Sequence, residues 1–459
     1  MKNIRVTIKI ILLTTLVCVL LLSPRVIATS FAEGATDFTL VGLKYGNSAV
    51  ATSAFQSQNG LKIANLVGKQ ITGVTELVNT NSVRALVENG NLSLYGDNNN
   101  LLNQGNQVSE FVLLASDYET GGIIYVDNIP YRGGILCKVN ANGKINLINW
   151  LKTDEYLYGV VHMEMSQANP IEALKAQAVA ARNFLCVSRN RHIADGFEVC
   201  TTTHCQVYGG YNKEYPSTNQ SVDETSGQLI YFNGTPINAY YHKNSGGFTQ
   251  NSQEVWGGKL DYLSSVKDIY SPDYNWSYYI SKNDFETKLK NYGISNIGTI
   301  QNVRINALNS TGYVSELIVN GSDGSSILKK ENIRAVLGFT NIKSLNFNLN
   351  SQPFSFFTMG VDKNNLYNLK DSNVMIANEY QSNQSVSTQN LYVINGSNQI
   401  TKLTSSTIDD TSNTDTIAFS GKGYGHGVGL SQDGAIQMAK KGFNYVDILK
   451  FYYSGVEVR

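Results

Sequence analysis

The stretch YLYGVVHMEMSQANPIEALKAQAVAAR, residues 156–182, decides how this chain is interpreted. Its second half predicts a helix over residues 170–188, because Asn169 suits the N-cap, Pro170 the first helical position and Glu172 the reciprocal position of a capping box. The buried face of that helix consists of apolar residues at three- and four-residue spacing, namely Leu174, Ala178, Ala181 and Leu185.

The first half of the stretch places one carboxyl group in an apolar setting. Glu164 is preceded by Val160, Val161 and Met163 and followed by Met165. An apolar environment disfavours the charged form, so we expect the pKa of Glu164 to rise, which suits a general acid near neutral pH. The alternative is a glutamate that simply points into solvent from the end of a strand.

Working outward, the texture of the sequence predicts an α+β fold. Residues 33–125 form a β-rich N-terminal region of short alternating runs with Gly and Asn turns. Residues 126–275 form the first part of a mixed α/β core around the Ala-rich helix. Residues 276–413 read as an inserted smaller subdomain, and residues 414–459 as the C-terminal part of the core. Further elements are predicted as strands over 228–232, 237–242, 303–308 and 314–319, and helices over 282–292, 431–441 and 445–453.

The N-terminus predicts export. Lys2, Arg5 and Lys9 precede an apolar run of 13 residues from Ile10 to Leu22. That run is short for a membrane-spanning helix of about 20 residues and suits the apolar region of a signal peptide. Residues 1–32 are therefore interpreted as a signal peptide or an uncleaved membrane anchor, which places the protein outside the cell or in the wall.

Composition argues against nucleic acid as a partner. The chain has 36 basic and 36 acidic residues, and residues 1–32 hold four of the basic ones and no acid, so the remainder has 32 basic against 36 acidic. A polyanion binder is normally basic. Only 16% of residues are charged while Tyr reaches 27 residues, a polar and aromatic composition that favours an uncharged partner such as carbohydrate.

Two glycine-containing stretches follow later in the chain. Asn244-Ser-Gly-Gly-Phe-Thr249 comes directly after a predicted strand, where a Gly pair makes a tight turn that exposes backbone N–H groups. Glycine then recurs at every second position from Gly421 to Gly429, around His426. This is no dinucleotide fingerprint, because no βαβ unit follows. Taken alone, each stretch is a weak indication of a binding site.

Two histidines and two cysteines fall within 14 residues: His192, Cys200, His204 and Cys205. Two thiolates and two imidazoles form a tetrahedral zinc set, although the spacing matches no zinc-finger pattern. A Cys200–Cys205 disulfide and a pair of free thiols remain as alternatives, and export would permit the disulfide.

Taken together, these motifs resemble the stage II sporulation protein D (SpoIID/LytB) family. The resemblance rests on ordered blocks: residues 156–165, 171–182, 205–208, 240–247, 332–338 and 423–432. It departs from the family pattern at Ser166, which stands for the usual Pro, at Lys422, which stands for Arg, and at Asp433, which stands for an aromatic residue. None of these changes removes a chemical group from the expected site.

The resemblance implies a peptidoglycan lytic transglycosylase, which cuts the glycan strand after N-acetylmuramic acid and leaves a 1,6-anhydro end. It implies Glu164 as the catalytic glutamate, and a substrate cleft bordered by the Ser245-Gly246-Gly247 turn, the His426 loop and Gln432, with Tyr208 and Tyr241 available to stack on sugars. It also implies a structural zinc ion on the four His and Cys positions, while the chemistry itself requires no cofactor.

Two other functions remain open. A non-catalytic wall-binding module that stimulates an amidase partner is the main alternative, a role that the family name also carries. A zinc hydrolase is disfavoured, because four protein ligands would close the metal site to water. The expected partners are glycan strands, an amidase, and the membrane only through the N-terminal segment.

Overall fold

The computed structural model describes residues 38–77, 80–103, 108–350 and 415–459, and six short strands between residues 357 and 402. It divides into two compact units. Unit 1 comprises the chain up to Tyr240 together with Met438–Arg459, and unit 2 comprises Tyr241–Gln437. Helices and several sheets occur in both, which confirms the predicted α+β class. The predicted signal segment, residues 1–32, lies outside the described residues.

Unit 1 begins with a run of strands and continues with helices. The strands are β1 (Phe38–Lys44), β2 (Thr52–Gln56), β3 (Leu61–Val67), β4 (Gln70–Leu77), β5 (Ser82–Glu88), β6 (Asn91–Gly96), β7 (Glu110–Ala115), β8 (Ile124–Val126), β9 (Ile129–Tyr131), β10 (Gly134–Val139), β11 (Ile145–Lys152), β12 (Val199–Cys200), β13 (Ile230–Phe232), β14 (Thr235–Pro236) and β29 (Glu457–Val458). The helices are α2 (Thr153–Glu164), α3 (Ile171–Ser188), α4 (Pro216–Asp223) and α9 (Tyr445–Tyr452).

A seven-stranded sheet in the order β12-β1-β11-β10-β7-β3-β4 forms the middle layer of unit 1. Alternate residues of one strand point to opposite faces, so a strand covered on both sides reads as a continuous apolar run. Strand β11 shows this pattern: Ile145 and Leu147 face a five-stranded sheet (β6-β5-β2-β8-β9), while Ile148 and Trp150 belong to the core under the helices.

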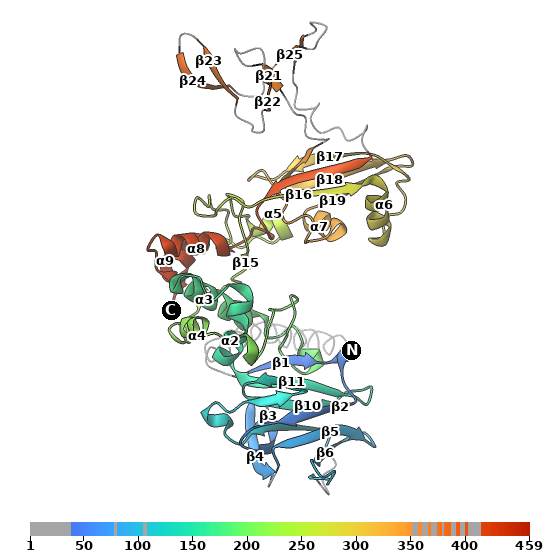
Figure 1. Cartoon of the computed structure of the whole chain (residues 1–459), viewed down its shortest axis with the longest axis vertical. Coiled ribbons are helices and arrows are strands. Elements are labelled where there is room, and N and C mark those ends of the chain that lie inside the picture. The colour runs from blue at the N-terminus through green and yellow to red at the C-terminus, as the bar shows by residue number, and fades with distance from the viewer. Residues whose placement is uncertain are drawn as a thin grey trace, which may run out of the picture. The chain divides into compact units, whose positions relative to one another are not determined.

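Helices α2, α3 and α4 cover the second face of the seven-stranded sheet, as Figure 1 shows. The core between them contains Tyr156, Leu157, Val160 and Val161 from α2, and Ala178, Ala181 and Leu185 from α3. The predicted buried face of the Ala-rich helix is therefore correct, since Leu174 is also fully buried. Small Ala residues let α3 approach its neighbours closely, and this packing positions the segment that ends at Glu164.

Unit 2 consists of two small sheets, of strand order β16-β27-β20 and β17-β18-β19, with helices α6 and α7 on a shared core. A two-stranded parallel pair, β15 with β28, completes it. The strands are β15 (Tyr241–His242), β16 (Asn275–Ser281), β17 (Ile300–Leu308), β18 (Val314–Gly321), β19 (Ser325–Lys329), β20 (Phe347–Asn350), β27 (Thr416–Lys422) and β28 (Leu430–Ser431). The helices are α5 (Ser252–Trp256), α6 (Lys282–Asn291) and α7 (Glu331–Leu337), and α8 (Gln432–Lys440) follows β28.

Three hairpins are described between β20 and β27 by their backbone pairing alone. Their strands are β21 (Phe357–Met359), β22 (Leu366–Asn368), β23 (Val374–Asn378), β24 (Gln381–Val386), β25 (Tyr392–Ile394) and β26 (Ile400–Lys402). The rest of the predicted segment 351–413 lies outside the described residues. Among the described helices, none combines the length and the apolar character needed to cross a membrane.

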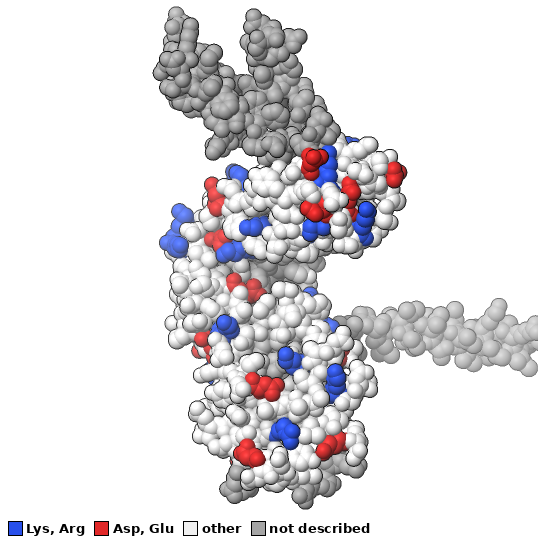
Figure 2. Space-filling view, turned by 45° about the vertical axis from the view of Figure 1, so that its right-hand side comes forward, with Lys and Arg blue, Asp and Glu red and all other residues white. Residues whose placement is uncertain are grey.

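The surface agrees with the composition. Figure 2 shows blue and red side chains interspersed over a mainly uncharged face, in line with a charged fraction of 16%. The face shown in Figure 2 therefore has no large area of positive charge of the kind that attracts a polyanion.

Several predicted elements are confirmed within one or two residues, namely helices α3, α6, α8 and α9 and strand β18, while β17 begins three residues before its predicted start. The predicted capping box of α3 is wrong. Pro170 occupies the N-cap position without a side-chain cap, while Asn169 donates to the Ser166 carbonyl and Glu172 accepts a hydrogen bond from the Tyr445 N–H. Glu172 therefore joins α3 to the start of α9.

The division of the chain also differs from the predicted one. The second unit spans Tyr241–Gln437 rather than residues 276–413. The physical reason is pairing over long sequence separations, because β16 pairs along its whole length with β27 and β15 pairs in parallel with β28. Residues 416–431 therefore belong to the same unit as residues 241–281.

Candidate active site

Glu164 is the last residue of helix α2. The next residue, Met165, is buried, adopts extended backbone and donates its N–H to the Val161 carbonyl at 2.8 Å, so the chain turns away from the helix at this point. Glu164 itself is half-buried, and its charge acts on the buried Tyr156 hydroxyl. The glutamate is thus held at the end of a well-packed helix, not at the end of a strand.

A glycine lets the segment 205–210 lie against α2. A Cβ at Gly159 would come within 2.6 Å of the Tyr208 ring, and the Gly209 N–H donates to the Gly159 carbonyl at 3.0 Å. Further along the helix, Met163 packs on Gly209. The structure therefore brings the motif around Glu164 and the motif ending at Tyr208 together along the last two turns of α2.

Tyr208 has a core position that does not support the predicted stacking on a sugar. Its side chain is 7% exposed, its ring stacks on Tyr156 with centroids 5.2 Å apart, and its hydroxyl donates to Asn149 Oδ1 at 2.9 Å. Burial raises the pKa of Tyr208. A stacking residue needs an open ring face, whereas Tyr208 fixes the segment 205–210 against α2.

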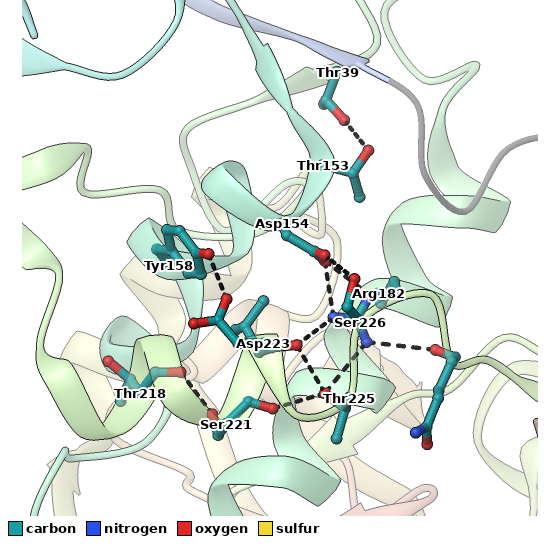
Figure 3. A network of polar contacts seen from close by, with 12 residues as sticks. Thr39, Thr153, Asp154, Tyr158, Arg182, Thr218, Ser221, Asp223, Thr225 and Ser226 are labelled. Carbon is teal, nitrogen blue, oxygen red and sulfur yellow. Dashed lines mark hydrogen bonds and ion pairs between the residues drawn. The ribbon is translucent and has the colours of Figure 1, made fainter. Parts of the chain in front are cut away.

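Beneath α2, a buried arginine connects three helices, as Figure 3 shows. The Arg182 side chain of α3 is 1% exposed and donates through Nε and Nη2 to Asp154 Oδ1, at 3.2 and 2.9 Å. The same guanidinium donates to the carbonyls of Val222 and Gln228 and to Thr225 Oγ1. Asp154 lies in the first turn of the helix that ends at Glu164, so this network sets the position of α2. Sequence reasoning assigned no role to Arg182.

The other carboxylates of residues 141–232 each have a hydrogen-bond or ion-pair partner within unit 1. Asp154 pairs with Arg182, Glu155 accepts from the Lys152 N–H, Glu172 and Glu224 pair with Lys175, Asp195 bonds His192, Glu198 pairs with Arg189 and Lys69, Glu214 pairs with Arg132, and Asp223 accepts from the Tyr158 hydroxyl.

The four predicted metal ligands converge in unit 1. One ligand atom of each of His192, Cys200, His204 and Cys205 lies within 4.8 Å of the others. His204 Nδ1 lies 3.2 Å from His192 Nε2, 3.7 Å from Cys200 Sγ and 3.6 Å from Cys205 Sγ. Tetrahedral zinc bonds of about 2.0–2.3 Å place neighbouring ligand atoms about 3.3–3.8 Å apart, so the spacing fits zinc.

The chemistry of this cluster also suits a metal. His192 Nδ1 lies 2.9 Å from Asp195 Oδ2, the carboxylate–histidine arrangement that orients a metal-ligating imidazole. Burial raises the pKa of the Cys200 thiol, but hydrogen bonds with Thr202, His204 and Cys205 outweigh it and lower this pKa to about 6. A thiolate is the form that binds zinc. All four cysteines of the described chain are free thiols, unlike the disulfide alternative.

In unit 2, the Ser245-Gly246-Gly247 turn is built from hydrogen bonds within the unit. Ser245 is fully buried, its Oγ donates to Asp268 Oδ2 at 2.8 Å, and it accepts from the Gly247 N–H. The Gly246 N–H donates to Asn244 Oδ1 at 2.9 Å. The Ser245 side chain thus stabilises the turn. If this segment binds a ligand, as predicted, it must do so through its backbone groups.

The glycine loop around His426 is anchored to the same turn. Asn244 and Tyr424 exchange both backbone hydrogen bonds, and the Gly425 N–H donates to the Lys343 carbonyl. Arg334, from the predicted block 332–338, is buried and donates through Nε to the Ile342 carbonyl. Three motifs that are far apart in the sequence are therefore adjacent within unit 2.

His426 is held by the backbone. The Val428 N–H donates to His426 Nδ1 at 3.0 Å, which leaves Nε2 to donate to the Tyr241 backbone. Burial, His242 and Arg334 lower the pKa of His426, and burial lowers the pKa of His242 to about 4. Both rings are therefore neutral at physiological pH, and the buried His242 Nδ1 is 3.2 Å from the Val428 carbonyl oxygen.

The two remaining predicted binding residues lie on the same parallel pair of strands or next to it. Tyr241 is partly exposed and pairs with Leu430. Gln432 is 6% exposed at the start of α8, and the Gly434 N–H in the first turn of that helix donates to Ser431 Oγ. The buried Gln432 side chain therefore has little exposed surface for contact with a ligand, whereas part of the Tyr241 side chain is exposed.

Gly425 is expected to be intolerant of a side chain. Its φ is 115°, and a Cβ there would lie 2.7 Å from the His242 Cβ. We expect Gly425→Ala to lower the free energy of unfolding by about 1–3 kcal/mol, measured by urea denaturation. Gly258→Ala is the control, because that position has an ordinary φ and open space around it. Equal stability of the two variants would contradict this account of the loop.

Comparison with known proteins shows which family the chain resembles. Residues 141–232, which hold Glu164, Arg182 and the His–Cys cluster, match the family model described as Stage II sporulation protein (SpoIID). The chain is 29% identical over 323 residues to stage II sporulation protein D of Bacillus subtilis (strain 168), covering 66% of this chain and 74% of that protein. Residues 141–232 therefore form a region similar to the SpoIID family, and the chain is similar to SpoIID proteins over about two thirds of its length.

Two further relatives bear on function. The chain is 28% identical over 326 residues to stage II sporulation protein D of Bacillus amyloliquefaciens, covering 66% of this chain and 73% of that protein. It is 29% identical over 390 residues to a Bacillus subtilis (strain 168) protein named amidase enhancer, an alignment that covers 82% of this chain and 52% of the relative. The chain thus spans about half the length of the amidase enhancer.

Proposed function

We propose that this protein is a peptidoglycan lytic transglycosylase that uses Glu164 as its only catalytic carboxyl group. The observation that carries the proposal is the placement of Glu164, which ends helix α2 in a half-buried position and acts electrostatically on the buried Tyr156 hydroxyl. A glycoside hydrolase needs two placed carboxylates, and a transglycosylase can act with one.

One carboxyl group suffices because the substrate supplies the nucleophile. The protonated Glu164 donates its proton to the leaving O4 oxygen as the bond from C1 of N-acetylmuramic acid breaks. The resulting carboxylate then takes the proton of the C6 hydroxyl as O6 bonds to C1, which closes the 1,6-anhydro ring and restores the acid. No water is consumed.

The His–Cys cluster is proposed to hold a structural zinc ion through His192, Cys200, His204 and Cys205. Four protein ligands complete a tetrahedral site, so the metal would supply stability and not a reactive water. Cys200 belongs to β12, which pairs with β1 at the edge of the seven-stranded sheet, and Cys205 opens the segment that packs along α2. The ion would thereby tie this segment to the sheet.

Zinc content tests the site directly. We expect the purified protein to contain about one zinc ion per chain by elemental mass spectrometry, and Cys200→Ser to lose it and to unfold at a lower temperature. Cys186→Ser is the matched control, because that thiol lies outside the cluster. Intact-mass evidence for a Cys200–Cys205 disulfide in a metal-free protein would contradict the proposal.

A second function has its own support. The alignment with the protein named amidase enhancer covers 82% of this chain, which favours a wall-binding module that stimulates an amidase partner. Such a module requires glycan binding and no proton transfer. Both functions act on peptidoglycan outside the cell, so we also propose export through the N-terminal segment, with a role in sporulation or wall remodelling.

Product analysis distinguishes these functions. Purified glycan strands, with and without stem peptides, are incubated with the mature protein and analysed by mass spectrometry. Anhydro-muramoyl ends are expected, and the strand form that yields them defines the substrate. Reducing ends would indicate a hydrolase. Intact strands of both forms, combined with faster cleavage by an added amidase, would establish the enhancer function instead.

A further inference from the structure

One tryptophan of this chain differs from the other two. Trp150 and Trp276 are 3% and 6% exposed, whereas Trp256 is 43% exposed. Large aromatic side chains contribute strongly to folding when buried and to recognition when presented at the surface. The exposed Trp256 side chain therefore stabilises the fold less than a buried tryptophan would, which raises the question of what it does at the surface of unit 2.

The backbone that carries Trp256 is held rigidly. Asn251 caps helix α5, because its side chain accepts from the Glu254 N–H, and the helix ends with Trp256 just before Gly257. The Gln250 N–H donates to the Gly427 carbonyl at 2.7 Å, which ties the start of α5 to the glycine loop. The Lys330 Nζ donates to the Gln253 carbonyl. The Lys330 backbone has φ 51° and ψ −135°, an unfavourable conformation for a residue with a side chain. The residue that contacts helix α5 is therefore held in a strained backbone conformation.

The exposed ring lies beside the His426 motif. The centroids of the Trp256 and His426 rings are 5.1 Å apart, with the ring planes tilted by 56°. His426 is neutral and fixed by its backbone bonds, and it lines a small pocket to which Gln250, Glu254 and Asn309 contribute polar groups and Val255 and Leu345 apolar ones. An aromatic surface next to a few convergent polar groups is the usual composition of a small-ligand site.

The residues that flank Trp256 in the sequence do not form a contiguous apolar patch. The neighbouring Gln253, Gly257, Gly258 and Lys259 are exposed and polar or without a side chain. Protein and membrane contacts use contiguous apolar patches, whereas this indole stands among hydrogen-bonding groups. A pyranose ring has the matching chemistry, because its C–H face packs on an aromatic ring while its hydroxyl and acetamido groups hydrogen-bond at the edge.

We propose that Trp256 is a stacking platform for a sugar ring of the glycan strand, with His426 as the fixed side of the platform. This inference rests on the proposed function, because glycan is the substrate there, and it adds a binding residue in unit 2 that the sequence motifs do not contain. Trp256 would bind the strand directly and take no part in proton transfer.

Tryptophan fluorescence tests the proposal. The full chain carrying Glu164→Gln, which binds without turnover, is titrated with purified glycan strands free of stem peptides. We expect a saturable change in emission. Trp256→Phe should abolish that change, and Trp256→Ala should weaken binding roughly tenfold as measured by co-sedimentation with purified wall. Circular dichroism checks that each variant is folded.

Two controls make the readout specific. Trp150 lines a separate pocket of about 470 Å³ in unit 1, so Trp150→Phe should leave the fluorescence change intact. Tyr279→Ala removes another exposed aromatic residue of unit 2 and should leave binding unchanged. A fluorescence change that survives Trp256→Phe, or unaltered affinity of Trp256→Ala, would overturn the platform.

The two proposals fail separately. If the protein with intact Glu164 produces anhydro ends but Trp256 fluorescence does not change with glycan, the stacking platform is overturned. The transglycosylase proposal is then still supported. Glycan binding through Trp256 without any cleavage supports the platform and favours the enhancer function. Strands that bind neither in the titration nor by co-sedimentation would overturn the platform.

Discussion

Replacing Glu164 by Gln should lower the rate of anhydro-end formation by roughly 10⁴-fold, the upper part of the range for general acid–base catalysis. Glutamine has nearly the same shape and still hydrogen-bonds, but it neither donates a proton to the leaving oxygen nor accepts one from the C6 hydroxyl. The expected loss therefore falls on kcat, with KM little changed, because binding of the strand does not depend on proton transfer. Initial rates measured by mass spectrometry over a range of strand concentrations separate the two constants.

Glu224→Gln is the matched control for this prediction. Glu224 follows helix α4 of the same unit, is exposed and pairs with Lys175, so its neutralisation should leave the rate unchanged within about twofold, as expected for a surface ion pair. Unchanged production of anhydro ends by Glu164→Gln would remove the glutamate from the mechanism. If that variant still stimulates an amidase as the unaltered protein does, the enhancer function gains support.

The rarity of metal-binding side chains made the His–Cys cluster readable from sequence. His192, Cys200, His204 and Cys205 stand close together in a chain with five histidines and five cysteines, and their ligand atoms do converge. Helix α3 was predicted for a different reason, since its apolar residues follow the helical period over five turns. Where rare residue types cluster or apolar residues follow a clear period, the local sequence is sufficient to predict the site or the helix.

Helix α2 was not predicted because its residues carry little helical preference. It contains Gly159 and the β-branched Val160 and Val161, which local rules assign to strands or turns. Packing outweighs this preference, because Gly159 admits the Tyr208 ring and the two valines fill the core over the seven-stranded sheet. The same packing explains the error on Tyr208, since a short motif does not reveal which faces of an aromatic ring are covered.

Trp256 and the boundary of unit 2 were missed because both depend on distant pairings. The segment Gln253–Gly258 shows no helical or strand periodicity that would mark Trp256 as a surface residue. The pairing of β16 with β27 joins residues about 140 positions apart, which no local pattern records.

Replacing Arg182 by Met should destabilise unit 1 by about 3–5 kcal/mol, the cost of removing one partner of a buried ion pair. Methionine fills a similar volume, but it leaves Asp154, Thr225 and the carbonyls of Val222 and Gln228 without their donor. For a unit of this size the loss corresponds to roughly 10 °C in Tm, which differential scanning calorimetry measures.

Arg84→Met provides the baseline for a surface arginine, because Arg84 is exposed on strand β5 and should contribute within about 0.5 kcal/mol. Arg182→Lys keeps the charge but not the planar fork, so an intermediate loss is expected. The double variant Asp154→Asn with Arg182→Met should cost less than the sum of the single changes if the pair interacts directly. Because Asp154 and Glu164 lie on the same helix, α2, we expect the Arg182 and Asp154 variants to lower kcat as well. If Arg182→Met is as stable as the unaltered protein, the polar network beneath α2 does not hold this helix in place.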